Sequence, residues 1–323
     1  MFWIFTAARR LKRLGILGMN HRNASCILDH NPRVLYPLVD DKLRMRDLCL
    51  RIGVPTPDVY AEIAYHSMLR HLHDYLGERD DFVIKPNRGS AGRGVLVVMG
   101  RAGNEYIRHN GERLRPEQIR QHLSDILSGM YSLGGRPDRA MVQQRIRLHP
   151  AFEAIAYKGI PDVRVILYRN RPAMAMLRLP TKASNGRANL HQGGIGAGVD
   201  LQTGITNHAV QRNHLVECHP DTGNSVVGMR VPYWSAILDM SCRVAAATGL
   251  GYLGVDIVVD AALGPMLLEA NARPGLAIQI ANARGLLPRL EEIRRESEFE
   301  HDAADETRPG VIGRIGQAFR RSA

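Results

Sequence analysis

Cysteine is scarce in this sequence, and its placement excludes two common classes of small-domain stabilisation. The four cysteines, Cys26, Cys49, Cys218 and Cys242, are scattered along 323 residues. This spacing gives neither the paired ligands of a structural zinc site nor a disulfide framework. No secretory signal precedes them, so we expect free, mostly buried thiols and a cytoplasmic protein.

The opening apolar stretch, MFWIF, is too short to span a membrane, and it lacks the small-residue cleavage pattern of a signal peptide. The basic run from Arg9 to Arg13 follows it. Two interpretations stay open. The simpler one is a frayed or partner-covered terminus, and the other is a basic amphipathic anchor at a membrane surface, formed with Phe2, Trp3, Ile4 and Phe5.

Aromatic residues are also few, at 6% of the chain, whereas basic residues exceed acidic ones to give a net charge of +11. This charge indicates an anionic ligand, which can be phosphate, an acidic peptide, a membrane or nucleic acid. So few aromatics offer no stacking platform for single strands, and much of the basic excess lies near the two ends. Nucleic-acid binding is therefore the less favoured interpretation.

Hydrophobic residues make up 45% of the chain, enough to bury a full core in one body of two or three lobes. No internal repeats are present. The patterning predicts strands at 82–86, 95–99, 140–146, 163–168, 173–179, 254–260 and 265–271. Helices are predicted from about 41 to 53, from Tyr65, from Pro116 to Met130, from Pro232, and from about 281 to 295, with a charged, aperiodic tail after that. Hairpin strands with separate helices indicate an α+β fold rather than a parallel doubly wound sheet.

A glycine-rich loop, NRGSAGRG, directly follows Lys85 at the end of an apolar strand. Glycines let backbone N–H groups approach phosphate oxygens, and a lysine at that position can pair with them. The Walker pattern and the GxGxxG fingerprint are both absent, because a strand and not a helix follows the loop. The loop is thus a candidate phosphate lid, with a plain hairpin turn as the alternative.

The hairpin GVDIVVDAALGPMLLEAN places two acids opposite each other. If residues 261–264 form the turn, Asp256 faces Glu269 and Asn271 returns to the same face. Opposed carboxylates, roughly 5 Å apart at Cβ, repel unless a proton or cation lies between them, and this oxygen-rich set suits magnesium, with manganese as a second option. The alternative is a salt-bridge network with nearby arginines such as Arg273. We favour the metal, because acids on such apolar strands are costly without a dedicated partner.

The segment from 162 to 194 gathers basic and amide side chains. Such donors stabilise a transferring phosphoryl group, although a solvated basic loop is the plain alternative. The candidates are Asp162, Arg164, Arg178, Lys182, Arg187, Asn189 and His191.

Taken together and in order, these motifs resemble the ATP-grasp superfamily, specifically the alpha-L-glutamate ligases that modify ribosomal protein, from about Asp41 to Ala281. The nearest description is a trimmed variant, alpha-L-glutamate ligase-like or sugar-transfer-associated ATP-grasp. The resemblance implies an ATP-grasp α+β fold with a truncated N-terminal lobe and the nucleotide between two lobes. It divides the chain into a short segment (1–40), an ATP-grasp domain (41–295, with a central lobe of about 57–144 and a C-terminal lobe of about 145–295) and a charged tail (296–323).

The resemblance also assigns roles to residues. Arg164, Arg178 and Arg187 are implied as catalytic, and Asp256, Glu269 and Asn271 as metal ligands. Nucleotide contacts are implied for Lys42, Lys85, Ser90, Gly92, Gly94, Gln143, Gln144, Arg145, Ile146, Asp162, Lys182 and Asn189. The chain departs from the family pattern at Gln144 and Arg145, where an acid and an aromatic are usual, and it carries an insertion at about 147–161.

The implied activity is that of an ATP- and magnesium-dependent carboxylate–amine ligase that forms an acyl phosphate and releases ADP. An amino acid such as glutamate would be joined to a peptide, a protein or a small amine. A module that binds ATP for regulation or scaffolding without turnover is the alternative, and a homo-oligomer stays open.

Overall fold

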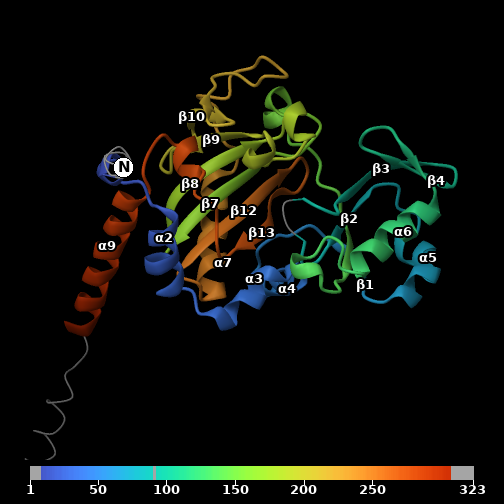
Figure 1. Cartoon of the computed structure of the whole chain (residues 1–323), viewed down its shortest axis with the longest axis horizontal. Helices are drawn as coiled ribbons and strands as arrows, with labels where there is room; N and C mark the ends of the chain where they lie inside the picture. The colour runs from blue at the N-terminus through green and yellow to red at the C-terminus, as the bar shows by residue number, and fades with distance from the viewer. Residues whose placement is uncertain (1–8, 90–91, 307–323) are drawn as a thin grey trace, which may run out of the picture.

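The computed structural model describes residues 9–89 and 92–306, which form two antiparallel sheets with helices around them (Figure 1). The first sheet is six-stranded, in the order β1-β6-β2-β3-β4-β5, and the second is seven-stranded, in the order β11-β10-β9-β8-β7-β12-β13. Every pairing in both sheets is antiparallel, which confirms the α+β prediction.

The strands of the first sheet are β1 (Val59–Ile63), β2 (Phe82–Pro86), β3 (Leu96–Ala102), β4 (Glu105–Arg108), β5 (Arg113–Leu114) and β6 (Ala140–Gln143). Those of the second are β7 (Asp162–Tyr168), β8 (Arg171–Leu179), β9 (Ile195–Val199), β10 (Thr206–Gln211), β11 (His214–Leu215), β12 (Tyr252–Asp260) and β13 (Gly264–Asn271).

The first sheet is covered by α5 (Leu72–Leu76) and α6 (Pro116–Leu127). Proline at the first helical position starts α6, as the sequence predicts. Ile119, Leu123 and Ile126 follow at helical spacing and are completely buried against the sheet. The helix expected from Tyr65 is instead a 3-10 segment (His66–His71) that leads into the short α5.

Both faces of the second sheet are buried. On one face, Val163, Val165 and Leu167 of β7 pack beneath α7 (Trp234–Thr248). On the other face, Ile166 and Tyr168 pack against α8 (Ile278–Ala281), α9 (Leu287–Glu306) and residues 17–27. The period of two in β7 therefore divides its residues between two cores. Asp162 and Arg164 belong to the second of these faces.

The single closing helix predicted for about 281–295 is wrong in two respects. The structure has two helices, α8 and α9, separated where a Cβ on Gly285 would lie only 2.1 Å from the backbone oxygen of Gly15. In addition, α9 continues to Glu306, where the sequence predicted an aperiodic tail after Arg295. Ion pairs such as Arg171 with Glu296 (2.9 Å) hold this helical extension against β8.

The chain before β1 forms α2 (Met19–His21), a π-helical turn (Arg22–Leu28), a 3-10 turn (Arg33–Leu35), α3 (Tyr36–Asp40) and α4 (Lys42–Arg51). Asn31 links this N-terminal part of the chain to the second sheet: its side-chain amide donates to the backbone oxygens of Tyr252 (2.7 Å) and Ala272 (3.0 Å). The aspartate at position 41 caps α4 by accepting from the Arg44 amide. Positions 42–46 of α4 are thereby held close to the end of β13.

The remaining short turns are 3-10 helices at Leu133–Gly135, Pro150–Ile155, Lys182–Ser184 and Leu190–Gln192, the second of which lies within the predicted insertion. All four cysteines are free, and of these Cys26 and Cys49 are buried whereas Cys218 is exposed. Among the described helices, none combines the length and apolar character that crossing a membrane requires.

Candidate functional site

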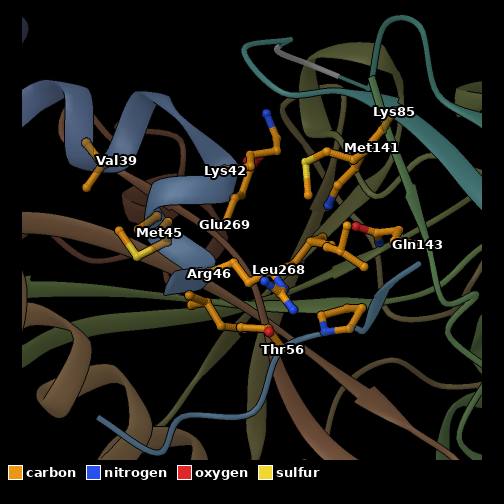
Figure 2. A pocket seen from close by; sticks show the side chains of 14 residues that line it. Val39, Lys42, Met45, Arg46, Thr56, Lys85, Met141, Gln143, Leu268 and Glu269 are labelled. Atoms are coloured by element: carbon orange, nitrogen blue, oxygen red, sulfur yellow. The ribbon is translucent and has the colours of Figure 1, made fainter. Parts of the chain in front are cut away.

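A pocket between the two sheets collects four of the predicted site residues, as Figure 2 shows: Lys42 from α4, Lys85 from β2, Gln143 from β6 and Glu269 from β13. The remaining wall is mostly apolar, with Met45, Thr56, Pro57, Met141 and Leu268 among its residues. The pocket thus has lysines near one carboxylate and an apolar side beside the strand predicted as the hinge.

Lys85 is the most unusual charge in this pocket. Its β2 neighbours are buried, and Lys85 itself is only 8% exposed. Burial and the nearby Lys42 lower the pKa of its ammonium group, Glu269 partly offsets them, and the resulting pKa is about 7. A buried lysine with so little compensation can pair with an anion that enters the pocket.

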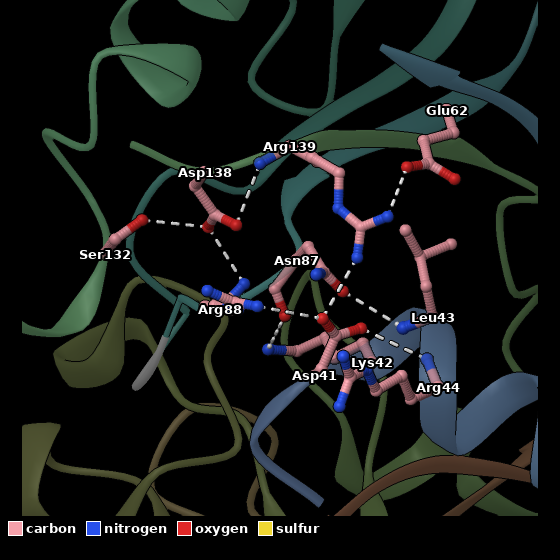
Figure 3. A network of polar contacts seen from close by, with 10 residues as sticks. All are labelled: Asp41, Lys42, Leu43, Arg44, Glu62, Asn87, Arg88, Ser132, Asp138 and Arg139. Carbon is pink, nitrogen blue, oxygen red and sulfur yellow. Dashed lines mark hydrogen bonds and ion pairs between the residues drawn. The ribbon is translucent and has the colours of Figure 1, made fainter. Parts of the chain in front are cut away.

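Lys42 joins the pocket to the base of the glycine-rich loop (Figure 3). Its ammonium group donates to the backbone oxygens of Gly89 (2.7 Å) and Asn87 (3.3 Å). The Asn87 side chain in turn accepts from the Leu43 amide at 3.0 Å. The start of α4 and the base of the loop are therefore joined by these three hydrogen bonds, and both predicted phosphate-binding lysines face the same space.

Each end of the loop is anchored by specific contacts. The Asp138 carboxylate accepts from the Arg88 amide and from the Ser132 hydroxyl, both at 2.8 Å (Figure 3). Gly94 has φ +71°, and a Cβ there would lie 2.6 Å from the Tyr131 ring, so this position requires glycine. Ser90, predicted at the tip, lies outside the described residues.

The β12–β13 hairpin pairs Asp256 with Glu269, as predicted, but by a different route. The turn is one residue shorter than expected, because Asp260 pairs with Gly264 and not with Pro265. A β-bulge between Asp256 and Ile257, where Leu268 has no partner of its own, restores the predicted register.

Two arginines from neighbouring strands hold Asp256, which is completely buried. Arg164 on β7 donates from Nε (2.7 Å) and Nη2 (2.5 Å) to its two oxygens. Arg178 on β8 donates to Asp256 at 2.7 Å and to Asp162 at 2.5 Å, bridging the two acids. The arginine partners expected as the alternative to a metal are therefore present for Asp256, although they are Arg164 and Arg178 and not Arg273.

Charge and burial shift the pKa values of Asp256 and Asp162 in opposite directions. Burial acts to raise the pKa of Asp256, but Arg164 and Arg178 outweigh it and the pKa ends below its usual range. Burial and the nearby Asp256 raise the pKa of Asp162, despite the opposing effect of Arg178. Burial would lower the pKa of Arg178, yet its two carboxylate partners raise it. The cluster therefore keeps Asp256 ionised.

The predicted metal ligands differ in what they can offer a cation. Glu269 is half-buried and lines the pocket, and its carboxylate has a weak contact (3.4 Å) with the Asn271 amide. Their oxygens fit a hard divalent cation. Asp256 accepts one arginine hydrogen bond at Oδ1 and two at Oδ2, so Oδ1 keeps acceptor capacity that a third ligand would use. Among the described residues, no group of three histidine, cysteine, aspartate or glutamate side chains is arranged to hold a metal ion.

The predicted residues of the segment 182–189 are not among those that line this pocket. Arg187 approaches the loop, since a Cβ on Gly92 would lie 3.7 Å from it, and it also donates to Gln192 at 3.3 Å. Lys182 is exposed, and Asn189 uses its side-chain oxygen to cap the next 3-10 turn.

The predicted hinge has both backbone and side-chain contacts. The backbone N–H of Gln144 donates to the backbone oxygen of Asp58 at 2.8 Å. The backbone N–H of Asp58 donates to the side-chain oxygen of Gln144 at 3.3 Å. Arg145 forms an ion pair with Asp81 at 2.8 Å, whereas Ile146 is half-buried and is not among the residues that line the pocket.

Sequence reasoning missed Asp41 and Arg139 as supports of the loop. Asp41 is 1% exposed and accepts from Arg139 at 3.0 Å and from Arg88 at 3.4 Å. Its only local signal is its position directly before a helix, which predicts a cap but not two arginine partners. Met141 and Arg46, which line the pocket, had no signal beyond their strand and helix patterns.

Comparison with known proteins gives one family match. The model of the family described as sugar-transfer associated ATP-grasp matches residues 21–295 of this chain. This match confirms the resemblance drawn from the motifs and identifies the two-sheet architecture as an ATP-grasp fold. A search of curated proteins finds no match.

Solved structures give weaker likenesses. The ATP-grasp ligase PsnB, complexed with minimal precursor, Mg and ADP, is 15% identical, with 83% of this chain and 62% of that chain covered and a TM-score of 0.43. The RimK domain protein ATP-grasp from Sphaerobacter thermophilus is 13% identical, with 81% and 70% covered and a TM-score of 0.44. D-alanine–D-alanine ligase from Bacillus anthracis, complexed with ATP, is 15% identical, with 82% and 69% covered and a TM-score of 0.44. This chain thus spans less than two thirds of the length of PsnB.

Proposed function

Because the chain belongs to the sugar-transfer associated ATP-grasp family, we propose that it is a magnesium-dependent ligase that uses ATP to join a carboxylate to an amine and releases ADP. The observation that carries the proposal is the shared pocket: Lys42, Lys85 and Glu269 come from three separate elements and line one space between the sheets. Family membership supports ATP as the ligand of that space.

In this proposal the triphosphate lies against Lys42 and Lys85, with the glycine-rich loop over it. Adenine lies beside Met141 and Gln143, where the wall is apolar and hinge backbone groups are close. Glu269 and Asn271, joined by Asp256, would hold magnesium, which would neutralise phosphate charge as the transfer proceeds.

The reaction has two steps. A substrate carboxylate oxygen attacks the γ-phosphorus, the bond to the β,γ-bridging oxygen breaks, and ADP leaves. An amine then attacks the acyl phosphate carbon and loses a proton, and phosphate leaves. Arg164, Arg178 and Arg187 are our candidates for stabilising the negative charge that develops. Arg164 and Arg178 are held on one face of the second sheet, and Arg187 lies near Gly92 of the glycine-rich loop.

We propose amino acids such as glutamate as the carboxylate substrate, and a peptide, a protein or a small amine as the acceptor. These assignments come from the resemblance to the alpha-L-glutamate ligases. Activity should therefore be sought with a panel of amino acids, acidic peptides and amines, scored by ADP release.

One observation favours the alternative, a module that binds ATP without turnover. Both oxygens of Asp256 are engaged by arginines, so one predicted metal ligand is already satisfied. The two functions separate in a single measurement: the alternative predicts nucleotide binding with no ADP release under any substrate combination.

The mechanism is tested by isotope transfer. With the substrate carboxylate labelled with heavy oxygen, one labelled oxygen should appear in the released phosphate, because the attacking oxygen stays with the phosphorus. ADP should be the nucleotide product. AMP as the sole nucleotide product, or unlabelled phosphate during verified amide formation, would overturn the acyl-phosphate route and indicate an adenylate.

A further inference from the structure

A second groove lies away from the nucleotide pocket, where the N-terminal segment meets β10, β11 and α8. Its floor is buried, with Leu17 and Val210 at 1% and 4% exposure. Its rim is apolar yet open to solvent, because Leu11, Leu215 and Ile280 are 51%, 73% and 46% exposed. Ile16, Leu190, Leu276, Ala277 and Ala283 complete the apolar lining. Large aliphatic side chains gathered in this way indicate an interaction surface.

The charged side chains that line this groove have one sign, and the nearby Glu292 of α9 interacts with one of them, Arg284. Arg212 and Arg284 line it, and no acidic residue does so in the described part of the chain. Helical residues 9–13 include Leu11 on the rim and carry four exposed cations. Arg10 and Lys12 flank Leu11 at about 100° around the helix, and Arg9 and Arg13 lie on its opposite side. None of these six side chains forms an ion pair with a described residue. Gln279, the one amide on the floor, is already satisfied by Leu17 and Leu286.

We propose that this face, the groove rim with Arg212, Arg284 and the basic helix at residues 9–13 beside it, docks on an anionic membrane surface. Exposed aliphatic residues surrounded by unpaired arginines and lysines are what a peripheral protein places at the headgroup boundary. A purely polyanionic partner such as nucleic acid would pair with the cations but leave Leu11, Leu215 and Ile280 in water. The partner must therefore carry both negative charge and an apolar layer.

The sequence outside the described residues points to the same partner. Phe2, Trp3, Ile4 and Phe5 lie there and precede the basic run by only a few positions. Aromatic and aliphatic residues followed by clustered cations have the composition of an interfacial anchor. The inference concerns where the protein binds and does not depend on the proposed ligase activity.

The test is co-sedimentation of the full chain with vesicles of phosphatidylcholine, with and without phosphatidylserine. Binding should require phosphatidylserine and weaken as salt is raised. Arg212→Ala combined with Arg284→Ala should lower the partition coefficient by roughly 25-fold, equivalent to about 1 kcal/mol for each basic group near the surface. Leu11→Glu combined with Ile280→Glu should lower it by more than tenfold.

Matched controls lie elsewhere on the chain. Arg70→Ala with Arg136→Ala removes two exposed cations near the first sheet, and Leu263→Glu charges a leucine that is 54% exposed in the β12–β13 turn. Both should bind vesicles like the wild type. All variants replace exposed side chains, so their thermal unfolding should match the wild type and report an intact fold.

Three results would overturn the proposal. The first is no binding to phosphatidylserine vesicles, or equal losses in the groove and control variants. The second is a concentration-dependent dimer that Leu11→Glu abolishes, which would make the groove a contact between copies of this chain. The third is saturable binding of monomeric short-chain phosphatidylserine with no binding to vesicles, which would make it a site for single amphiphiles.

Discussion

Lys85 should take up a proton when nucleotide binds. In the structure its pKa is about 7, because burial outweighs the partial compensation from Glu269 and Lys42 adds repulsion. At pH 8 about nine tenths of such a group is neutral, and at pH 6 only about one tenth. Phosphate oxygens beside the amine would restore its ordinary pKa. Binding should therefore consume roughly 0.9 protons per nucleotide at pH 8 and roughly 0.1 at pH 6.

Isothermal titration calorimetry with magnesium and a non-hydrolysable ATP analogue measures this uptake. The binding enthalpy is compared in buffers of different ionisation enthalpy, and the slope gives the number of protons. Lys85→Met should lose the uptake at pH 8, whereas Lys12→Met, at an exposed lysine near the N-terminus, should keep it. Equal uptake by wild type and Lys85→Met, or no change between pH 6 and pH 8, would refute the reasoning that places phosphate beside this buried amine.

Three further predictions follow from the same site. Because the folded pKa of Lys85 lies below its unfolded value of 10.5, the unfolded state binds more protons between pH 7 and 10.5. The unfolding free energy of the wild type relative to Lys85→Met should therefore rise across this window, by up to about 1.4 kcal/mol per pH unit in urea denaturation. Glu269→Gln should abolish the magnesium dependence of nucleotide binding at unchanged stability, whereas Asp256→Asn, which leaves Arg164 and Arg178 underpaired, should also cost about 3–5 kcal/mol in the same denaturation assay. Finally, tryptic cleavage after Arg88 and Arg93 should slow on adding magnesium and the analogue, and unchanged cleavage at saturation would count against the loop as a phosphate cover.

Local sequence signals located the elements that carry the site. The run FVIKP forms β2 with the predicted bounds, and Pro116 begins α6. Each depends on neighbouring residues alone, through β-branched side chains or a proline at the first helical turn. The end of α9 could not be located in this way, because the sequence after Arg295 is mostly charged and lacks a helical apolar period, and the ion pairs of Arg171 come from β8.

Register was harder to predict than strand position. The pairing of Asp256 with Glu269 was expected from a turn that is one residue too long, and the bulge beside Ile257 compensates. Neither feature has a clear signal in GPMLLEAN, since any residue of that apolar run can be left unpaired. The arginine partners of Asp256 could not be predicted from the sequence. Arg164 meets it only because β7 lies between β8 and β12, and that strand order is a property of the whole sheet.

The sequence left open whether a metal ion or arginine side chains balance the charge of Asp256, and in the structure Arg164 and Arg178 do so. Two opposed carboxylates need positive charge near them, and this need alone favoured a metal at Asp256. In the structure, Arg164 and Arg178 supply the positive charge beside Asp256. Charge balance therefore predicted correctly that a cationic group is present, but it could not tell an arginine from a metal ion. Glu269 forms no ion pair with a described residue, although its charge acts on Lys85 and Arg178. It lines the pocket, while Asp256 is completely buried. Glu269 is therefore the more accessible of the two carboxylates. In our proposal a divalent cation therefore lies on the β13 side, and Asp256 would join its ligands through Oδ1, which carries only one arginine hydrogen bond.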